Sequence, residues 1–509
     1  MPEIESPNHE TGPAGRPTSL RRLDLVALGL VALLVRIPAY FSQRHLTFDD
    51  GVFASSVIAM RHGGVPFREV FSSQGPLFLP LVWLGDLFGG RSLDAPRTTA
   101  VISGLALTLL TYWAALAVAD RLGALLAGAV TATSGVVAWV SGPIAADGPA
   151  LAFAIGAVGL TLRLRRRPTM WLAAATGLAV GAALSTKAIE AHILVPVGLV
   201  LAAPLGAGLR ERRMDAQAIG RALVAGIAAL AVFVAISLPF GFADVWDQSF
   251  RYRTEAAEGP QPVANSAKML STLWDRDLVL YLFAAACVAL ALLRATRRCP
   301  RRIGVDDREL PADDLSFPSA GVVVASWAIA TAGWLMFAVS PMWRAHVSAV
   351  TIPVALLLAR HRPPRPMLAT LAVVAIPLAG VQLYDLLDPG PYNARDGEIV
   401  AALEALPQGA WAIPDDPGWA WRAGRRTTDD LVDTSMLRVQ QGRYSSVSLA
   451  RQAADPRVCA VVISSPDRFG AFADLPSRLE RSGYVVARSW EPSAALWVRP
   501  RCDPPADSS

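Results

Sequence analysis

The chain has 509 residues, of which 53% are apolar and only 17% are charged, whereas about a quarter of the residues in a soluble domain carry charge. Its net charge of +5 comes from Arg residues in short loops and not from a basic stripe with interleaved aromatics, which excludes a nucleic-acid partner. The four Cys residues form no CxxC pair and no Cys/His metal spacing. The apolar residues fall in blocks near the length that crosses a bilayer, which predicts a polytopic α-helical membrane protein.

The N-terminal residues carry no apolar block, and residues 1–22 are predicted to be a disordered cytoplasmic tail. The first apolar block follows Arg21 and Arg22 and has no small-residue cleavage site, which indicates a retained anchor and not a signal peptide. Residues 23–385 are predicted to form the transmembrane domain. We expect eleven spans, at 24–42, 98–119, 122–141, 147–162, 170–186, 189–208, 218–240, 278–294, 318–338, 345–360 and 367–385.

Basic loops set the predicted sidedness of these spans. Arg residues gather at 163–167, 210–213, 294–302 and 360–365. Because basic loops stay on the cytoplasmic side, these four loops and a cytoplasmic N-terminus alternate consistently with the eleven spans. The sequence therefore predicts a multi-pass protein of the plasma membrane with its C-terminal end outside.

The same alternation makes residues 43–97 one long outer loop. Within it the apolar stretch Pro76–Gly89 has about 14 residues, against the ~20 that a full crossing requires. We expect an interfacial or re-entrant helix there. The alternative is that residues 76–90 do cross and that a later block does not, which would invert the downstream loops.

Beyond residue 385 the pattern changes to that of a soluble α/β domain, 386–509, on the outer side. A helix-like stretch at 397–405 precedes strand-like runs at 460–464, 484–487 and 495–498. Cys459 and Cys502 both fall in this domain, where a disulfide is permitted, and their pairing is a hypothesis.

The first outer loop carries two adjacent acids, Asp49 and Asp50, directly after the first span. A helix over Val52–Arg61 follows them. One interpretation is that either acid simply caps this helix. Capping does not need two acids, however, and carboxylates close to a bilayer carry a desolvation cost that usually has a functional reason.

Further charged residues fall on the same predicted side. Asp147 follows the third span, and the only two Lys residues, Lys187 and Lys268, both lie in predicted outer loops. Glu190 lies three residues after Lys187. The alternatives are an N-cap for Asp147 and snorkelling at the interface for Lys187.

The second long outer loop, 241–277, combines cations with aromatic residues. Arg251 and Arg253 have the chemistry to clamp a phosphate, and Trp246 and Tyr252 have rings that stack on lipid or sugar. The same residues fit a plain surface helix equally well. Arg344 and His346 stand at the outer entry of the tenth span, where a single His is often structural.

The first outer loop resembles the GT-C glycosyltransferases, in particular the family of protein mannosyltransferases and aminoarabinose transferases. That family has an acid pair after the first transmembrane helix, then a Gly-x-x-Pro-Tyr-x-Asp-x-Phe pattern, a Pro-Pro-Leu-like turn and an apolar helix ending in Phe-Gly. The matching residues here are Asp49-Asp50, Gly64-x-Pro66-Phe67-Arg68-Glu69-Val70-Phe71, Gly75-Pro76-Leu77 and Phe88-Gly89.

The resemblance implies a transferase that takes its sugar from a polyprenyl-phosphate carrier at the outer face and passes it to an envelope glycan, lipid or protein. Asp49 would be the general base, with Asp50 in support and Asp147 orienting a substrate. Many family members place a Lys in the turn that is Gln74-Gly75-Pro76 here, so other cations would have to hold the phosphate. We predict Arg68, Lys187, Arg251 and Arg253 for the phosphate, and Gln74, Glu190, Trp246, Tyr252, Arg344 and His346 for substrate.

No cofactor and no metal is expected, although Asp49, Asp50 and Asp147 have ligand chemistry that suits a divalent ion. Two other functions stay open. A flippase for lipid-linked sugars would bury charges near mid-membrane and show repeated halves, and the sequence shows neither. A non-catalytic envelope scaffold would tolerate substitution of Asp49 and Asp50.

Overall fold

The computed structural model describes residues 17–210, 215–257, 259, 261–296, 318–361, 364–490, 493–502 and 504. Six helices in these ranges are long and apolar enough to cross a membrane, or seven if a bent pair counts as one span. The fold is thus that of a multi-pass membrane protein, while the count of eleven spans is not confirmed. Part of the predicted tail, residues 1–16, lies outside the described residues, and residues 17–22 are helical and not disordered.

A helix nevertheless lies at each of the eleven predicted positions, because each block is apolar over several turns. The bundle helices are α1 (Pro17–Tyr40), α4 (Thr98–Ala115), α5 (Arg121–Thr133), α6 (Gly135–Ser141), α7 (Asp147–Arg166), α8 (Met170–Thr186), α9 (Leu194–Arg210), α10 (Ala216–Ser237), α13 (Pro262–Thr296), α14 (Ala320–Phe337), α15 (Ser348–Arg360) and α16 (Arg365–Leu387).

Small residues allow the bundle helices to pack closely. A Cβ atom on Gly177 of α8 would lie 2.1 Å from the carbonyl oxygen of Ala225 of α10, and Gly181 meets Ala229 in the same way. Small residues four apart let two helix backbones approach in a lipid environment, where packing and not hydrophobic burial drives association.

Asp277 explains two irregularities of the bundle. It breaks the helical backbone inside α13, and its carboxylate accepts hydrogen bonds from the Ser134 hydroxyl (2.6 Å) and the Gly135 N–H (2.7 Å). It thereby caps α6 at the point where α5 and α6 meet at 60°. The part of α13 before Asp277 belongs to the second outer loop, which also contains α11 (Phe242–Trp246), a π-helical turn at Asp247–Arg251 and α12 (Tyr252–Glu255).

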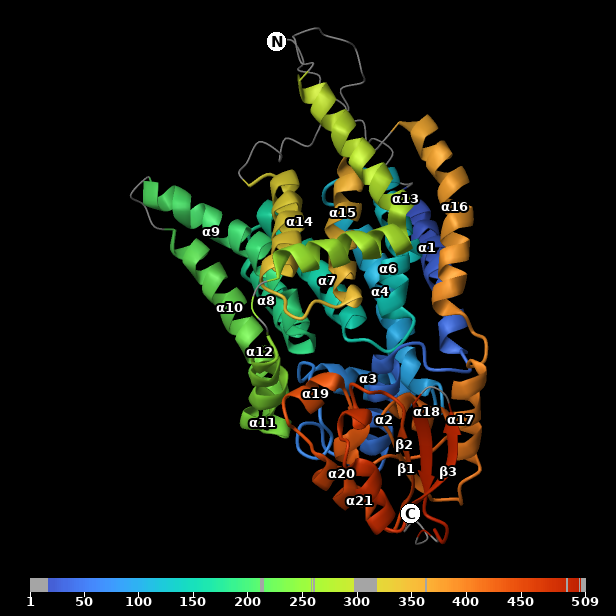
Figure 1. The fold of residues 1–509 in the computed structure, drawn as a ribbon. Coiled ribbons are helices and arrows are strands. Elements are labelled where there is room, and N and C mark those ends of the chain that lie inside the picture. Colours follow the sequence, from blue (N-terminus) through green and yellow to red (C-terminus); the bar gives the residue numbers. More distant parts are fainter. Residues whose placement is uncertain are drawn as a thin grey trace, which may run out of the picture.

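The first outer loop forms α2 (Phe48–Arg61), α3 (Phe78–Phe88) and a 3-10 turn at Ala95–Arg97. With 11 residues at ~1.5 Å each, α3 is too short to cross a bilayer. Figure 1 shows α2 and α3 at one end of the bundle, beside the C-terminal sheet.

The C-terminal segment is built on a four-stranded mixed sheet in the order β1-β2-β4-β3. β1 (Trp411–Pro414) is parallel to β2 (Val458–Ile463), and β4 (Ala494–Val498) is antiparallel to both β2 and β3 (Val485–Trp490). The sequence predicted three of these strands but not β1. The surrounding helices are α17 (Ala394–Glu404), α18 (Pro417–Arg422), α19 (Met436–Gln440), α20 (Ser446–Ala453) and α21 (Leu475–Arg481), with a 3-10 turn at Asp429–Val432.

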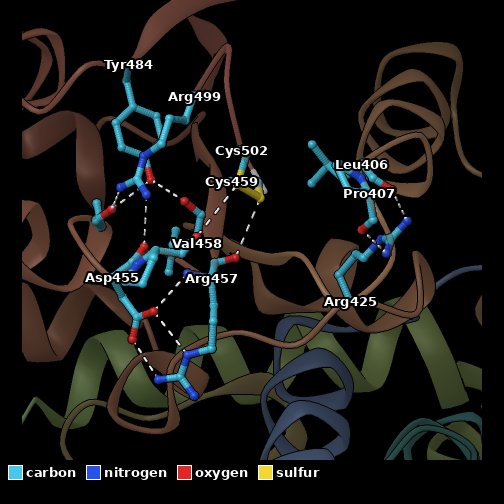
Figure 2. Close-up of a disulfide and its surroundings, with 12 residues drawn as sticks. Leu406, Pro407, Arg425, Asp455, Arg457, Val458, Cys459, Tyr484, Arg499 and Cys502 are labelled. Carbon is cyan, nitrogen blue, oxygen red and sulfur yellow. Dashed lines mark hydrogen bonds and ion pairs between the residues drawn. A yellow bond between two sulfur atoms is a disulfide. The ribbon is translucent and has the colours of Figure 1, made fainter. Parts of the chain in front are cut away.

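Cys459 and Cys502 form a disulfide, as hypothesised from the sequence. It ties β2 to the chain beyond β4, as Figure 2 shows. Nearby, Arg499 donates to the carbonyl of Ala453 (2.7 Å), and the Tyr484 hydroxyl donates to the carbonyl of Val458 (2.8 Å). The disulfide and these bonds all lie at one end of the sheet, where β2 begins and β4 ends.

Candidate active site

The acid pair lies on a helix that is held between the bundle and the C-terminal segment. A Cβ on Gly51 of α2 would stand 2.4 Å from the Cα of Gly418 of α18, so only glycines allow this approach. The Ser55 hydroxyl donates to the carbonyl of Pro417 (3.1 Å), and the Trp421 indole donates to the carbonyl of Leu93 (2.9 Å). The C-terminal segment therefore forms one wall of the site.

Asp50 points into the protein. It is fully buried and pairs with Arg97, whose Nη2 lies 2.6 Å from Oδ2. It also accepts from the backbone N–H groups of Leu46 and Ile144, both at 3.0 Å. With these partners Asp50 cannot reach a substrate, and it instead fixes the first turn of α2.

Asp49 points the other way and has exposed surface. Its carboxylate is nevertheless surrounded closely enough that desolvation raises the pKa to about 6. The carboxylates of Asp433 and Asp147 raise this pKa as well, while the cations of Lys187 and Arg253 lower it. A carboxyl group with such a pKa is basic enough to accept a proton and is still largely ionised at neutral pH.

Lys187 is the cation best placed beside this acid. It caps α8, and its Nζ lies 2.6 Å from Oδ2 of Asp147, the first residue of α7. The turn at Gly75 packs directly on this end of α8, since Gly75 N–H donates to the carbonyl of Thr186 (3.1 Å). A Cβ on Gly75 would lie 2.2 Å from the Ser185 carbonyl oxygen, so the contact requires glycine.

Two further predicted residues join this group. Arg253 is half-buried and donates to the carbonyl (3.3 Å) and hydroxyl (3.0 Å) of Ser73. His346 is buried and lies within charge-interaction range of Lys187, Asp147 and Arg253. We call Asp49, Asp147, Lys187, Arg253, His346 and Asp433 the outer charge cluster.

Other predicted site residues lie apart from this cluster. Arg251 is exposed and pairs with Glu255 on its own helical turn, and Arg344 is exposed and pairs with Asp275. Trp246 is 52% exposed and stacks on Phe250, an arrangement typical of aromatic residues at a membrane interface.

The remaining predicted residues are buried or turn outward. Tyr252 is buried, and its hydroxyl lies 3.3 Å from that of Ser435. Gln74 is buried in its turn, and Arg68 is exposed. Glu190 is buried against Nε2 of His192 at 3.2 Å. The Nδ1 atom of His192 accepts a hydrogen bond from the Trp327 indole (3.1 Å).

Sequence reasoning missed Arg97, Asp433 and Lys268. In the sequence, Arg97 stands at the start of a span and has the pattern of an ordinary flanking cation. Asp433 lies in a polar stretch without a motif. Lys268 was placed outside but given no role, and its Nζ donates to the carbonyl of Met342 (2.8 Å) beside the cluster. Within the described residues no group of three His, Cys, Asp or Glu side chains is arranged to hold a metal ion.

Comparison with known proteins gives fold-level matches only. No family model and no curated protein matches the chain. Among solved structures, ArnT from Cupriavidus metallidurans in the apo state matches 94% of this chain and 98% of its own, with 13% identity and a TM-score of 0.62. Its form bound to undecaprenyl phosphate matches 95% and 98%, with 14% identity and a TM-score of 0.59.

A second protein gives a weaker match of the same kind. The Archaeoglobus fulgidus oligosaccharyltransferase in the apo form matches 96% of this chain and 76% of its own, with 14% identity and a TM-score of 0.53. Both likenesses extend from the first outer loop through the bundle to the C-terminal segment. The chain therefore has the GT-C glycosyltransferase fold that its first outer loop indicated.

Proposed function

We propose that the protein is a membrane glycosyltransferase that moves a sugar from a polyprenyl-phosphate carrier to a cell-envelope acceptor on the outer face. The observation that supports this most directly is the contrast within the acid pair. Asp50 is buried in an ion pair with Arg97. Asp49 has exposed surface, lies near the cations Lys187 and Arg253, and has a pKa raised to about 6, chiefly by desolvation.

In this mechanism Asp49 acts as the base. As the acceptor hydroxyl oxygen attacks the anomeric carbon, its proton passes to the Asp49 carboxylate. The bond from the anomeric carbon to the phosphate oxygen breaks, and the electron pair leaves with the phosphate. No general acid is needed, because the carrier phosphate departs as a stable anion. The proton on Asp49 then returns to solvent.

Lys187 and Arg253 would hold the carrier phosphate. They are the two cations that act on Asp49, and Lys187 lies against the turn that contains Gly75. Many members of the family that the first outer loop resembles carry a Lys in that turn, and in this chain Lys187 follows the end of α8 that packs on the turn. A carrier of this type is also suggested by the undecaprenyl phosphate bound to ArnT and by the dolichol phosphate bound to the archaeal oligosaccharyltransferase.

The test is transfer by the purified protein in liposomes. A panel of radiolabelled polyprenyl-phosphate sugars would be offered together with an envelope extract. We expect one donor to label the extract with wild type but not with Asp49→Asn, and Arg251→Gln, which lies apart from the cluster, to behave as wild type. Labelled carrier crossing the bilayer without transfer would instead identify a flippase, and a protein inert to every donor would favour a scaffold.

A further inference from the structure

The turn Ser72–Gly75 of the first outer loop contacts both segments that supply the proposed phosphate cations. Arg253 donates to the carbonyl (3.3 Å) and the hydroxyl (3.0 Å) of Ser73. At the end of the turn, the glycine N–H donates to the carbonyl of Thr186 (3.1 Å), the residue before Lys187. No side chain of the turn itself is charged. The turn is therefore a common support for Arg253 and Lys187.

Gln248 of the second outer loop holds this turn. Its Oε1 accepts from the N–H of Ser72 (3.0 Å), and its Nε2 donates to the carbonyl of Phe67 (2.6 Å). Beside it, the Ser249 hydroxyl donates to the carbonyl of Gln74 (2.7 Å). Phe67, Ser72 and Gln74 are all buried, and a buried backbone group needs a hydrogen-bond partner. A glutamine amide suits the task, because it has both an acceptor oxygen and N–H donors.

The backbone of Phe67 is strained, and the second outer loop contacts this residue at two points. Its φ is +68°, in the left-handed region that residues with a Cβ rarely adopt. The buried ring lies 5.7 Å, centroid to centroid, from that of Phe240 in the 3-10 turn Leu238–Phe240. The carbonyl accepts from Gln248. Strain of this kind persists only where the surrounding contacts fix it, so removing Gln248 favours relaxation of the bend that leads into the turn.

The same part of the second outer loop is attached independently to the C-terminal segment. Gln441 donates to the carbonyl of Tyr252 (2.8 Å). Arg443 pairs with Asp247 (2.9 Å) and with Glu255 (3.1 Å). This part of the loop therefore keeps an anchor when Gln248 is changed, and we expect the effect of the change to be confined to the turn.

We propose that Gln248 is a positioning residue of the donor site. By holding the turn, it keeps Arg253 and Lys187 in place and so sets the affinity for the carrier phosphate. The inference rests on the proposed function and adds to it a residue that acts through the two cations and not on the reacting atoms. Cations that are held in position before binding give a higher affinity than cations that must be ordered on binding.

Gln248→Leu removes both hydrogen bonds at a similar side-chain size. KM for the sugar donor should rise about tenfold, because the charge-assisted contacts to phosphate are weakened, while kcat should change by less than about twofold. A general folding defect would instead lower the active fraction and with it the apparent kcat. Gln452→Leu is the matched control and should behave as wild type. Gln452 lies on α20 and also makes two side-chain hydrogen bonds, to Thr428 and Asp430, but none to the turn.

A double variant tests whether the effect passes through a cation. In an Arg253→Gln background, Gln248→Leu should raise the donor KM by less than about threefold, because residues that act together are not additive. A further rise of about tenfold in that background would show that Gln248 acts independently of Arg253 and would overturn the proposed route.

Two measurements do not depend on transfer. Amide hydrogen exchange of the turn should be faster in Gln248→Leu than in Gln452→Leu, because the Ser72 N–H loses its acceptor. Undecaprenyl phosphate should bind about tenfold more weakly to Gln248→Leu than to the control in detergent solution. Unchanged exchange or unchanged binding would overturn the inference.

The failure of the inference is distinguishable from the failure of the proposed function. A wild type that transfers sugar, together with a Gln248→Leu variant of the same donor KM, would refute the positioning role alone. A wild type that neither binds undecaprenyl phosphate nor transfers from any donor would refute the proposed function, and the positioning role would fail with it.

Discussion

Asp50 and Arg97 form an ion pair in which neither side chain has any exposed surface. Arg97 also donates to the carbonyls of Ser42 (2.9 Å) and Arg44 (2.5 Å), and its guanidinium lies over the ring of Trp421. One side chain thus connects the end of the first span, the first turn of α2 and the C-terminal segment. We therefore propose separate roles for the two adjacent acids, Asp50 in folding and Asp49 in chemistry.

Breaking this pair should destabilise the protein. Arg97→Met would leave Asp50 as a buried unpaired charge, and we expect a loss of about 3–5 kcal/mol in unfolding free energy. Thermal unfolding of the detergent-solubilised protein would measure it. Asp49→Asn is the control, and it should keep the wild-type melting temperature while losing transfer. Equal destabilisation by both variants would contradict the separation of roles.

Transfer should depend on the protonation of Asp49. Its pKa is raised to about 6 chiefly by desolvation, and a base works only when deprotonated, so kcat/KM should fall about tenfold per pH unit below pH 6 and level off above it. The charged groups that act on Asp49 are Lys187, Asp433, Asp147 and Arg253. A pH profile from 4.5 to 8 would test this, and a midpoint near 4 would mean that Asp49 is not the titrating base.

Lys187 should affect the sugar donor more than the acceptor. Lys187→Gln removes a cation from the proposed phosphate site, and the loss of a charge-assisted hydrogen bond should raise KM for the donor by roughly 10- to 100-fold. Lys187→Arg should retain most of the affinity. Steady-state kinetics with the donor varied would show it. A change confined to KM for the acceptor would mean that Lys187 does not hold the carrier phosphate.

The disulfide should matter for stability and not for chemistry. Its two cysteines are 43 residues apart, and a cross-link over such a loop contributes about 2–4 kcal/mol. Replacing Cys459 and Cys502 by Ser should therefore lower the melting temperature, with transfer retained at low temperature. After treatment with a reductant, the wild-type protein should have the same melting temperature as the double variant. Labelling of Cys459 and Cys502 themselves by a thiol reagent in the unreduced wild type, located by mass spectrometry, would contradict the bond.

The sequence predicted the positions of the helices well, because hydropathy over several turns depends only on neighbouring residues. It missed β1, which has only four residues, Trp411–Pro414, and ends in a Pro, whereas β2 is a longer run of small and β-branched residues. It also could not show that α2 is covered by α18. That contact depends on Gly51 and Gly418 meeting across most of the chain, and neither glycine is part of a local pattern.

The candidate site was predicted in part. Asp49, Asp147, Lys187, Arg253 and His346 come together in the outer charge cluster. Arg251, Trp246 and Arg344 were predicted from residue type alone, and their side chains find partners on the surface. Asp433 was missed because only the packing of the C-terminal segment on α2 brings it to the site.

The close approach of Gly51 to Gly418 joins two segments that are synthesised far apart in time. Ser55 and Pro417, which bond beside these glycines, lie 362 positions apart. During synthesis Asp49 therefore leaves the ribosome long before its facing wall exists, and every membrane helix must be inserted before α18 can dock. Only the last quarter of the chain supplies this wall, so a product truncated within the bundle lacks one side of the candidate site.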